Sequence, residues 1–271
     1  MITMYKIAVS VICYDNEEEV LDFADKLSRQ KDSEKIVLLV TCNKCMNVKK
    51  LINDLNEIKI SSQIFEPGEN LGYLHGCLYG FKEFGEEYEW AVISNTDIDF
   101  VSDSFFSKLL DNHYDSKIGC IGPDITLKVT GKQQNPFALS RPGNALMKFR
   151  KVVYANYFLY RLYYVLSDIK NKISHTETRK ENEYVYGVHG SVVILRKECI
   201  DKFLEDSIQI FMYGEELYIA EKLKENQFLS YYDKNLKIIH NENQSTGKIA
   251  SQRKQKWCSQ SINFLVERYW K

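Results

Sequence analysis

The sequence lacks several features that would assign it to a large functional class. No apolar run approaches the roughly 18 residues that a membrane-spanning helix needs. Neither sign of charge is in excess, because 36 lysines and arginines face 37 aspartates and glutamates, giving a formal net charge of −1. A general nucleic-acid binder needs a basic surplus to neutralise phosphates, so we expect no nucleic-acid partner.

Three sequence signatures of common enzyme classes are also missing. The chain has no GxxxxGK[ST] loop, no GxGxxG after its first apolar run and no GxSxG elbow. These absences argue against P-loop chemistry, a dinucleotide oxidoreductase and an α/β-hydrolase, respectively. The hydrophobic share of 44% is ordinary for a globular protein, so we expect a folded chain.

The seven cysteines are an odd number, and several lie in apolar, strand-like runs. Because no signal-peptide pattern stands at the N-terminus, we expect reduced thiols in a cytoplasmic protein. Cys42 and Cys45 form a CxxC, but no second pair completes a zinc site. We therefore interpret this spacing as coincidence at a strand end rather than as a redox or zinc motif.

Strand and helix patterns alternate through the first part of the chain. Apolar, β-branched runs predict strands, and apolar residues at helical spacing predict the helices between them. The strands are expected at 6–13, 35–40, 62–65 and 90–94, and the helices at 17–30, 48–55 and 74–81. This alternation implies a parallel, doubly wound sheet, which binds its ligands at the carboxyl ends of the strands.

Beyond Pro123 the pattern loosens, and glycines and prolines over 124–145 predict a loop region. We find no internal repeat, low-complexity segment or linker. The prediction is one α/β domain with halves at 1–123 and 124–250, followed by a C-terminal helix at 251–271.

An acidic loop, Asn95-Thr96-Asp97-Ile98-Asp99, directly follows the strand predicted at 90–94. Oxygen ligands in such a loop can hold a hard cation, which can in turn hold a diphosphate. An Asx-rich turn that caps the next helix explains the same residues. The sequence of the loop is compatible with both a cation site and a helix-capping turn.

Two further polar positions have a structural and a chemical interpretation. Glu215-Glu216 opens a helix, where acids favour the helix dipole, but a carboxylate there can also act as a general base. His240 ends the apolar run 236–239. It is either structural or a neutral imidazole that completes a metal site begun by Asp97.

In their order along the chain, these segments resemble family-2 inverting glycosyltransferases with the GT-A fold, in particular the rhamnosyltransferase-like branch of bacterial polysaccharide biosynthesis. The matching segments are VSVICYDN at 9–16, Asn70-Leu71-Gly72-Tyr73 with Gly76, SNTDI at 94–98, GVHGSVVILR at 187–196, FMYGEEL at 211–217, and His240 with Ser245-Thr246. The resemblance implies a Rossmann-like, mostly parallel central sheet with flanking helices and a C-terminal helical extension.

The resemblance also assigns roles to matching residues. It makes the first half the nucleotide-sugar-binding half and the second the acceptor and catalytic half. Glu216 becomes the catalytic base, beside Glu215. Asp97 and His240 become ligands of Mn²⁺ or Mg²⁺, with Asp99 as the fallback ligand. The implied acceptor-side residues are His189, Gly190 and Ser191, and the implied donor-binding residues are Cys13, Tyr14, Asn16, Thr41, Asn43, Asn70, Gly72, Tyr73, Gly76, Asn95, Thr96 and Asp97.

The sequence departs from the family pattern at three positions. Thr41 stands where the second strand usually ends in an aspartate that contacts the nucleobase. Glu216 stands where the branch mostly has aspartate, and Tyr218 replaces a second acid. These departures put the nucleobase contact in doubt and keep open a catalytically degenerate, sugar-nucleotide-binding protein.

The implied reaction is a single displacement that inverts the anomeric carbon. A UDP- or dTDP-sugar donates to a hydroxyl of a growing cell-surface glycan, such as a lipid-linked capsule or O-antigen chain. A nucleotidyltransferase is the other enzyme considered, but it usually carries a glycine-rich, basic loop after the first strand, and residues 13–19 contain no glycine.

The segment 152–167 predicts one helix crowded with aromatic residues. It is either a buried helix packed on the sheet or a docking surface on the inner face of a membrane, where tyrosine rings are sheltered and their hydroxyls stay wet. Neighbouring lysines and arginines favour anionic headgroups. In the docking interpretation Tyr157, Phe158 and Tyr160 contribute to the membrane contact.

Overall fold

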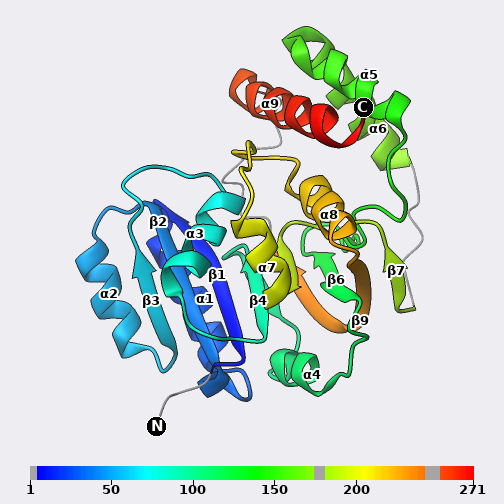
Figure 1. Ribbon diagram of the computed structural model, residues 1–271. Coiled ribbons are helices and arrows are strands. Elements are labelled where there is room, and N and C mark those ends of the chain that lie inside the picture. The colour runs from blue at the N-terminus through cyan, green and yellow to red at the C-terminus, as the bar shows by residue number, and fades with distance from the viewer. Residues whose placement is uncertain (1–4, 174–180, 242–250) are drawn as a thin grey trace.

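The computed structural model describes residues 5–173, 181–241 and 251–271 (Figure 1). In chain order the elements are β1 (Ile7–Tyr14), α1 (Glu17–Ser28), a 3₁₀ turn (Ser33–Lys35), β2 (Ile36–Lys44), α2 (Val48–Glu57), β3 (Ser61–Phe65), α3 (Leu74–Phe84), β4 (Trp90–Ser94), β5 (Ile98–Phe100), α4 (Phe105–Asp111), β6 (Ile118–Leu127), α5 (Asn144–Ala155), α6 (Tyr157–Ile173), β7 (Glu183–Val185), β8 (Val192–Arg196), α7 (Lys197–Leu204), α8 (Glu215–Glu225), β9 (Leu229–His240) and α9 (Gln252–Tyr269). Within these ranges, no helix combines the length and the apolar character needed to span a membrane.

The strands of the described residues form one nine-stranded sheet in the order β3-β2-β1-β4-β8-β6-β9-β5, with β7 also paired to β9. The first four run parallel. Strand β8 lies antiparallel between β4 and β6, while β6 and β9 are parallel. The mostly parallel, helix-flanked sheet predicted from the sequence is confirmed. In the order of the sheet, antiparallel pairs occur only on the far side of β4, where β8, β5 and β7 lie.

The core consists of two apolar layers, one on each face of the sheet, because side chains alternate along a strand. In β1, Ala8 belongs to the layer covered by α3, α7 and α8, whereas Val9 and Val11 belong to the layer covered by α1 and α4. All of these side chains are buried. Each of the two buried valines stabilises the fold by roughly 1.5–3 kcal/mol relative to its exposed form.

The single helix predicted over 152–167 is wrong, because the chain breaks at Asn156 into α5 and α6. The side-chain oxygen of Asn156 accepts hydrogen bonds from the N–H groups of Phe158 and Leu159, and so caps the start of α6. These helices pack on each other and on α9 rather than on the sheet, and Figure 1 shows the three together at one end of the molecule.

Two other expectations need correction. The loop predicted over 124–145 is shorter, because β6 continues to Leu127 and α5 begins at Asn144. Cys42 and Cys45 form a disulfide, with their Cα atoms 5.6 Å apart, so the expectation of only reduced thiols is wrong for this pair. Cys13, Cys77, Cys120 and Cys199 are buried free thiols.

Candidate metal and catalytic site

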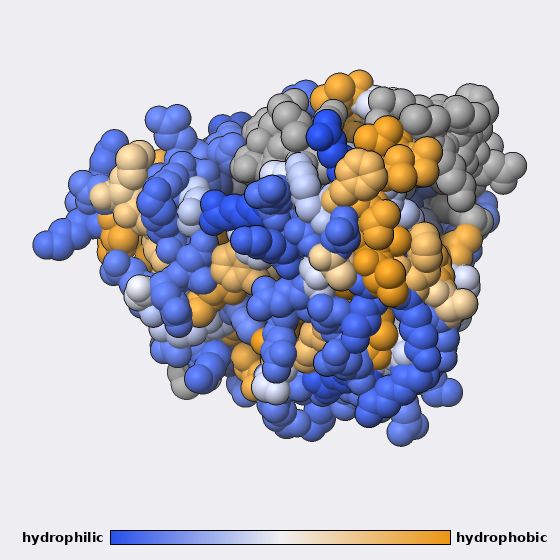
Figure 2. All heavy atoms as spheres, turned by 90° about the horizontal axis from the view of Figure 1, so that it is seen from above, coloured by the Kyte–Doolittle hydropathy of each residue, from blue (hydrophilic) through white to orange (hydrophobic). Residues whose placement is uncertain are grey.

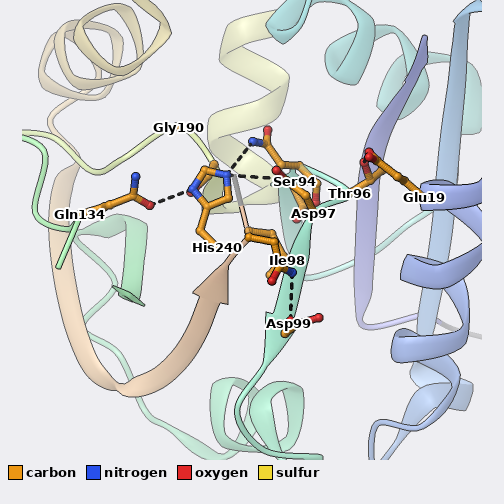
Figure 3. A network of polar contacts seen from close by, with 12 residues as sticks. Glu19, Ser94, Thr96, Asp97, Ile98, Asp99, Gln134, Gly190 and His240 are labelled. Atoms are coloured by element: carbon orange, nitrogen blue, oxygen red, sulfur yellow. Dashed lines mark hydrogen bonds and ion pairs between the residues drawn. The ribbon is translucent and has the colours of Figure 1, made fainter. Parts of the chain in front are cut away.

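The pairing of β5 with β9 brings Asp97 and His240 together. In this antiparallel pair Ile98 lies opposite His240, and the N–H of Asn241 donates to the carbonyl of Asp97. The Nε2 atom of His240 then lies 3.3 Å from a carboxylate oxygen of Asp97, and both side chains are largely buried. The predicted convergence of these two residues is confirmed (Figure 3).

Gln134 determines which nitrogen of His240 faces Asp97. Its side-chain oxygen, which can only accept, lies 2.8 Å from Nδ1, so Nδ1 carries the proton. On the other side of the ring, the amide nitrogen of Asn95 lies 3.4 Å from Nε2. Nε2 therefore faces both this amide and the Asp97 carboxylate, where a divalent cation would find an imidazole nitrogen and a carboxylate oxygen together. Mn²⁺ and Mg²⁺ accept such oxygen and imidazole ligands.

We predict that Gln134→Leu weakens divalent-metal binding by roughly 10–100-fold, the usual effect of losing a partner that orients a ligating histidine. Mn²⁺ titration of the purified protein measures this change. Gln134→Glu keeps an acceptor for Nδ1 and should restore most of the affinity. Equal affinity in the wild type and the leucine variant would show that His240 needs no such support.

Asp99, the fallback ligand, does not join Asp97 and His240. Its carboxylate lies 2.5 Å from the ammonium of Lys26 and accepts a hydrogen bond from Asn241 at 2.9 Å. Burial alone would raise the pKa of Asp99, but these two partners outweigh burial and lower it. We therefore correct the expectation for Asp99, which holds β5 against α1 through Lys26 and against the end of β9 through Asn241.

The predicted donor loop at 70–73 is held by Asn43 at the end of β2. The amide nitrogen of Asn43 donates to the carbonyl of Gly72 at 2.8 Å, and its oxygen accepts from the N–H of Leu71 at 3.1 Å. The side chain of Asn70 accepts from the N–H of Gly72. Gly72 has a φ of +77°, and a Cβ there would lie 2.0 Å from the carbonyl oxygen of Phe211. Only glycine permits this close packing.

Thr41 lies beneath this loop. It has 0% exposed surface, and its hydroxyl donates to the carbonyl of Gly76 at 2.8 Å. A side chain in this state has no surface for a nucleobase, so the direct donor contact expected of Thr41 is corrected to a supporting role. Gly76 itself packs against Ile12, where a Cβ would lie 2.5 Å from a methyl carbon.

The end of β1 is joined to the acidic loop by a polar network. The amide of Asn16 accepts from the N–H of Tyr14 at 2.7 Å and donates to the Thr96 hydroxyl at 3.1 Å. Glu19 accepts from both Asn16 and Thr96. Cys13 is buried beside this network, and Tyr14 is exposed. Glu19 was not predicted from the sequence. Its position in the first turn of α1, directly after the end of β1 where ligands of such a sheet bind, was the available signal (Figure 3).

The turn at 189–191 connects the metal-site residues with Glu216. The N–H of Gly190 donates to the Glu216 carboxylate, and a Cβ on Gly190 would lie 3.0 Å from that carboxylate. The hydroxyl of Tyr73 donates to the Gly190 carbonyl at 3.0 Å, and the N–H of Asn95 donates to the Ser191 carbonyl at 2.8 Å. The donor loop, the acidic loop and Glu216 therefore converge on one turn.

His189 is held in this turn as a neutral imidazole. Its Nδ1 accepts from the N–H of Ser191 at 3.2 Å, and its ring centre lies 6.1 Å from that of His240. Burial and the proximity of His240 lower the pKa of His189 to about 4. The segment Ser245-Thr246, which the resemblance placed in the same site, lies outside the described residues.

Glu215 and Glu216 begin α8 as adjacent carboxyl groups, of which Glu215 is buried and Glu216 is half-buried. The backbone turns sharply before them, with a φ of +66° at Tyr213 and +109° at Gly214. A Glu215 oxygen accepts from the N–H of Tyr213 at 2.9 Å, which directs that carboxyl back into the turn. Burial and the charge of Glu216 raise the pKa of Glu215 to about 8, and burial raises the pKa of Glu216.

These raised pKa values predict two pH effects of opposite sign. A base must be ionised, so the rate should rise with pH and reach half its maximum above the ordinary glutamate pKa of 4.5.

The stability prediction concerns Glu215. In the unfolded chain this carboxyl group loses its proton near pH 4.5, whereas in the folded protein it keeps its proton up to about pH 8. The free energy of unfolding should therefore fall across this window. The pH profile of the rate measures the first effect, and thermal melts at several pH values measure the second. In Glu215→Gln the melting temperature should depend less on pH than in the wild type. A wild-type stability that is constant over the window contradicts the assignment.

Comparison with known proteins gives structural relatives alone. No protein-family model matches the sequence, and no curated protein is significantly similar to it. A mannosyltransferase from Pyrobaculum calidifontis, solved with GDP-Man and Mn²⁺, superposes on 90% of the chain with a TM-score of 0.58 and 11% identity. GalNAc-T7, solved with UDP, GalNAc and Mn²⁺, superposes on 98% of the chain with a TM-score of 0.63 and 12% identity.

These two likenesses confirm the GT-A-type fold predicted from the sequence. The chain spans 59% of the length of the mannosyltransferase and 49% of that of GalNAc-T7. At such identities the likeness establishes the fold, and the chemistry must be argued from the residues of this chain.

Proposed function

We propose that this protein is a metal-assisted glycosyltransferase that moves a sugar from a nucleotide sugar to an acceptor hydroxyl. The observation that carries the proposal is the arrangement of Asp97, His240 and Glu216 around the turn at 189–191. The pair that would hold a cation and the half-buried carboxyl group of Glu216 thus lie around one turn. Relatives of the same fold were solved with Mn²⁺ and with GDP-Man or with UDP and GalNAc, which supports the same class of donor here.

Each part of the site has a task in this reaction. A divalent ion held by Asp97 and His240 would neutralise charge on the departing nucleoside diphosphate. The loop at 70–73 and the network of Asn16 and Thr96 position the donor. Glu216 accepts the proton of the acceptor hydroxyl, which attacks the anomeric carbon from the face opposite the nucleotide. One displacement of this kind inverts the anomeric configuration.

A panel of UDP-, dTDP- and GDP-sugars with Mn²⁺ or Mg²⁺ tests the proposal. We expect slow, metal-dependent release of the nucleoside diphosphate from one donor, because water can replace the acceptor. Donor binding without release would support the catalytically degenerate alternative. Release of pyrophosphate from a nucleoside triphosphate would instead identify a nucleotidyltransferase. Burial raises the pKa of Glu216, as the base of the proposed enzyme requires, and the panel decides between the enzyme and the binding protein.

We further propose that the acceptor is lipid-linked and that α5 and α6 rest on the membrane surface. Large apolar side chains are exposed on both helices, and Figure 2 shows hydrophobic residues gathered on this face of the molecule. Those on α6 recur at helical spacing, and the exposed set is Leu146, Phe149, Val152, Phe158, Leu159, Leu162, Val165 and Leu166. Among the described residues, an exposed apolar stripe of this length is characteristic of an interaction surface.

The charges around this stripe favour an anionic lipid surface as its partner. Residues 144–167 contain four basic residues and no acidic residue. Lys254 of α9 lies over the rings of Tyr164 in α6 and Tyr213 beside Glu215, at 5.4 and 4.8 Å from their centres. The apolar surface is therefore adjacent to the segment that carries the proposed base.

Anionic liposomes should bind the protein weakly, and the bound fraction should fall as salt rises, since each lysine or arginine at the surface contributes about 1 kcal/mol. Replacing Phe158, Leu162 and Leu166 with serine should abolish most of this binding in a sedimentation assay. Tyr160 is left intact, because it is 3% exposed and packs inward, contrary to its expected role in docking.

A matched control replaces Val101 and Val129, two exposed valines outside α5 and α6, with serine. This control variant should partition like the wild type. Equal liposome binding by the α6 variant and the wild type would assign the stripe to another partner.

A further inference from the structure

Three cysteine sulfur atoms meet at the carboxyl ends of β1 and β2. Cys13 and Cys42 are direct partners in the parallel register of these strands, and Cys45 lies in the turn that precedes α2. The sulfur atoms of all three lie within 4.8 Å of one another. Across the part of the chain that the structure describes, no other three His, Cys, Asp or Glu side chains come this close.

We propose that Cys13, Cys42 and Cys45, in their reduced form, bind a thiophilic metal ion such as Zn²⁺ through three thiolates. This site is separate from the Asp97–His240 pair, because soft thiolate ligands select Zn²⁺ or Cu⁺, whereas carboxylates select Mg²⁺ and Mn²⁺. The proposal does not depend on the transferase activity proposed above.

The placement of the sulfurs suits this chemistry. Zinc–sulfur bonds of about 2.3 Å in tetrahedral geometry separate the sulfurs by about 3.8 Å. The three sulfurs lie within 4.8 Å of one another with the Cys42–Cys45 bond formed, and reduction frees that pair to take the wider spacing. Cys13 and Cys42 are fixed by buried strands, while Cys45 is half-buried in a turn and supplies the adjustable ligand. Three protein ligands leave a fourth position for water or another small ligand.

The charges near Cys13 also favour a bound cation. The carboxylates of Glu17 and Asp15 act electrostatically on Cys13. The same carboxylates would attract a metal ion bound to its sulfur. Lys44 opposes this attraction in part, but its ammonium is paired with Asp15.

The Cys42–Cys45 disulfide is the competing state of the site. A dithiol reductant supplies two electrons and two protons, which convert the disulfide into two thiols as the reductant becomes a disulfide. Three thiols then bind one metal ion and release three protons. Either state ties together the residues that flank Asn43, whose amide holds the loop at 70–73.

Cobalt binding to the reduced protein tests the proposal. The full chain is reduced with a dithiol, freed of reductant without oxygen, and titrated with Co²⁺ and then Zn²⁺. We expect one equivalent of Co²⁺ to produce a thiolate-to-cobalt charge-transfer band that Zn²⁺ abolishes. Cys13→Ser should weaken binding roughly 100-fold, since tight structural zinc binding depends on every ligand. The oxidised protein should give no band.

Three variants make the result specific. Cys258→Ser, which alters a free cysteine outside the cluster, should leave the band unchanged. Asp97→Ala should also keep it, which separates the two metal sites. Cys45→Ser removes a second proposed ligand and should also weaken cobalt binding. Because Cys45 is half-buried in a turn, this change disturbs the fold less than a change at the buried Cys13. Absence of the band in the reduced wild type, or equal cobalt affinity in the Cys13 and Cys45 variants and the wild type, would overturn the proposal.

Discussion

Replacing Asp97 with alanine is expected to reduce metal-dependent transfer by roughly 1,000-fold or more. Stabilisation of the leaving group by a metal ion contributes several kcal/mol, and each 1.36 kcal/mol corresponds to a factor of ten in rate. Asp97 is the carboxylate that faces Nε2 of His240, so its loss would remove the oxygen ligand of the proposed pair. Steady-state rates with the donor identified by the panel measure the effect.

Asp99→Asn is the matched control for Asp97→Ala. It removes a neighbouring carboxylate whose partners are Lys26 and Asn241, so it should lower the melting temperature more than the rate. Thermal melts of both variants separate loss of the site from loss of the fold. If Asp99→Asn proves as damaging to the rate as Asp97→Ala, the metal lies at a different position in the acidic loop.

The second large effect is expected for Glu216→Gln, which should lower the rate by roughly 10²–10⁴-fold, the usual contribution of a general base. Donor affinity should stay close to the wild-type value, because Glu216 accepts a hydrogen bond from the turn at Gly190, whereas Asn43 holds the donor loop. Single-turnover rates and equilibrium binding of the donor distinguish these two quantities.

Glu215→Gln is the internal comparison for the base. Glu215 accepts a hydrogen bond from the N–H of Tyr213, so its carboxyl group is directed into the backbone turn. Glu215→Gln should therefore lower the rate less than Glu216→Gln does. A larger loss in Glu215→Gln than in Glu216→Gln would reverse the assignment of the pair.

The first half of the fold could be predicted because its periodicities are local. Runs such as Ile36–Val40 are buried on both faces of a parallel sheet and therefore appear as continuous apolar segments. The acidic loop after β4 was also visible, because carboxylates directly after a buried strand need a partner. The break at Asn156 was not visible, since the aromatic pattern continues across it and only a side-chain cap interrupts the helix.

The missing parts of the site depend on pairings between distant segments. Gln134 reaches His240 from a loop more than 100 positions earlier, and no short-range pattern distinguishes it from Gln133. Cys13 joins the CxxC only because β1 and β2 pair in one particular register. Thr41 illustrates the opposite error, since a position matched by resemblance and expected to contact the donor is buried under the loop at 70–73.

Anomalous diffraction from crystals grown with Mn²⁺ and the matching nucleoside diphosphate tests the central claim most directly. The account predicts a manganese peak within about 2.0–2.6 Å of an Asp97 oxygen and the Nε2 atom of His240, with the diphosphate on its open side. A peak at any other group of residues, or a diphosphate bound away from the turn at 189–191, would contradict it.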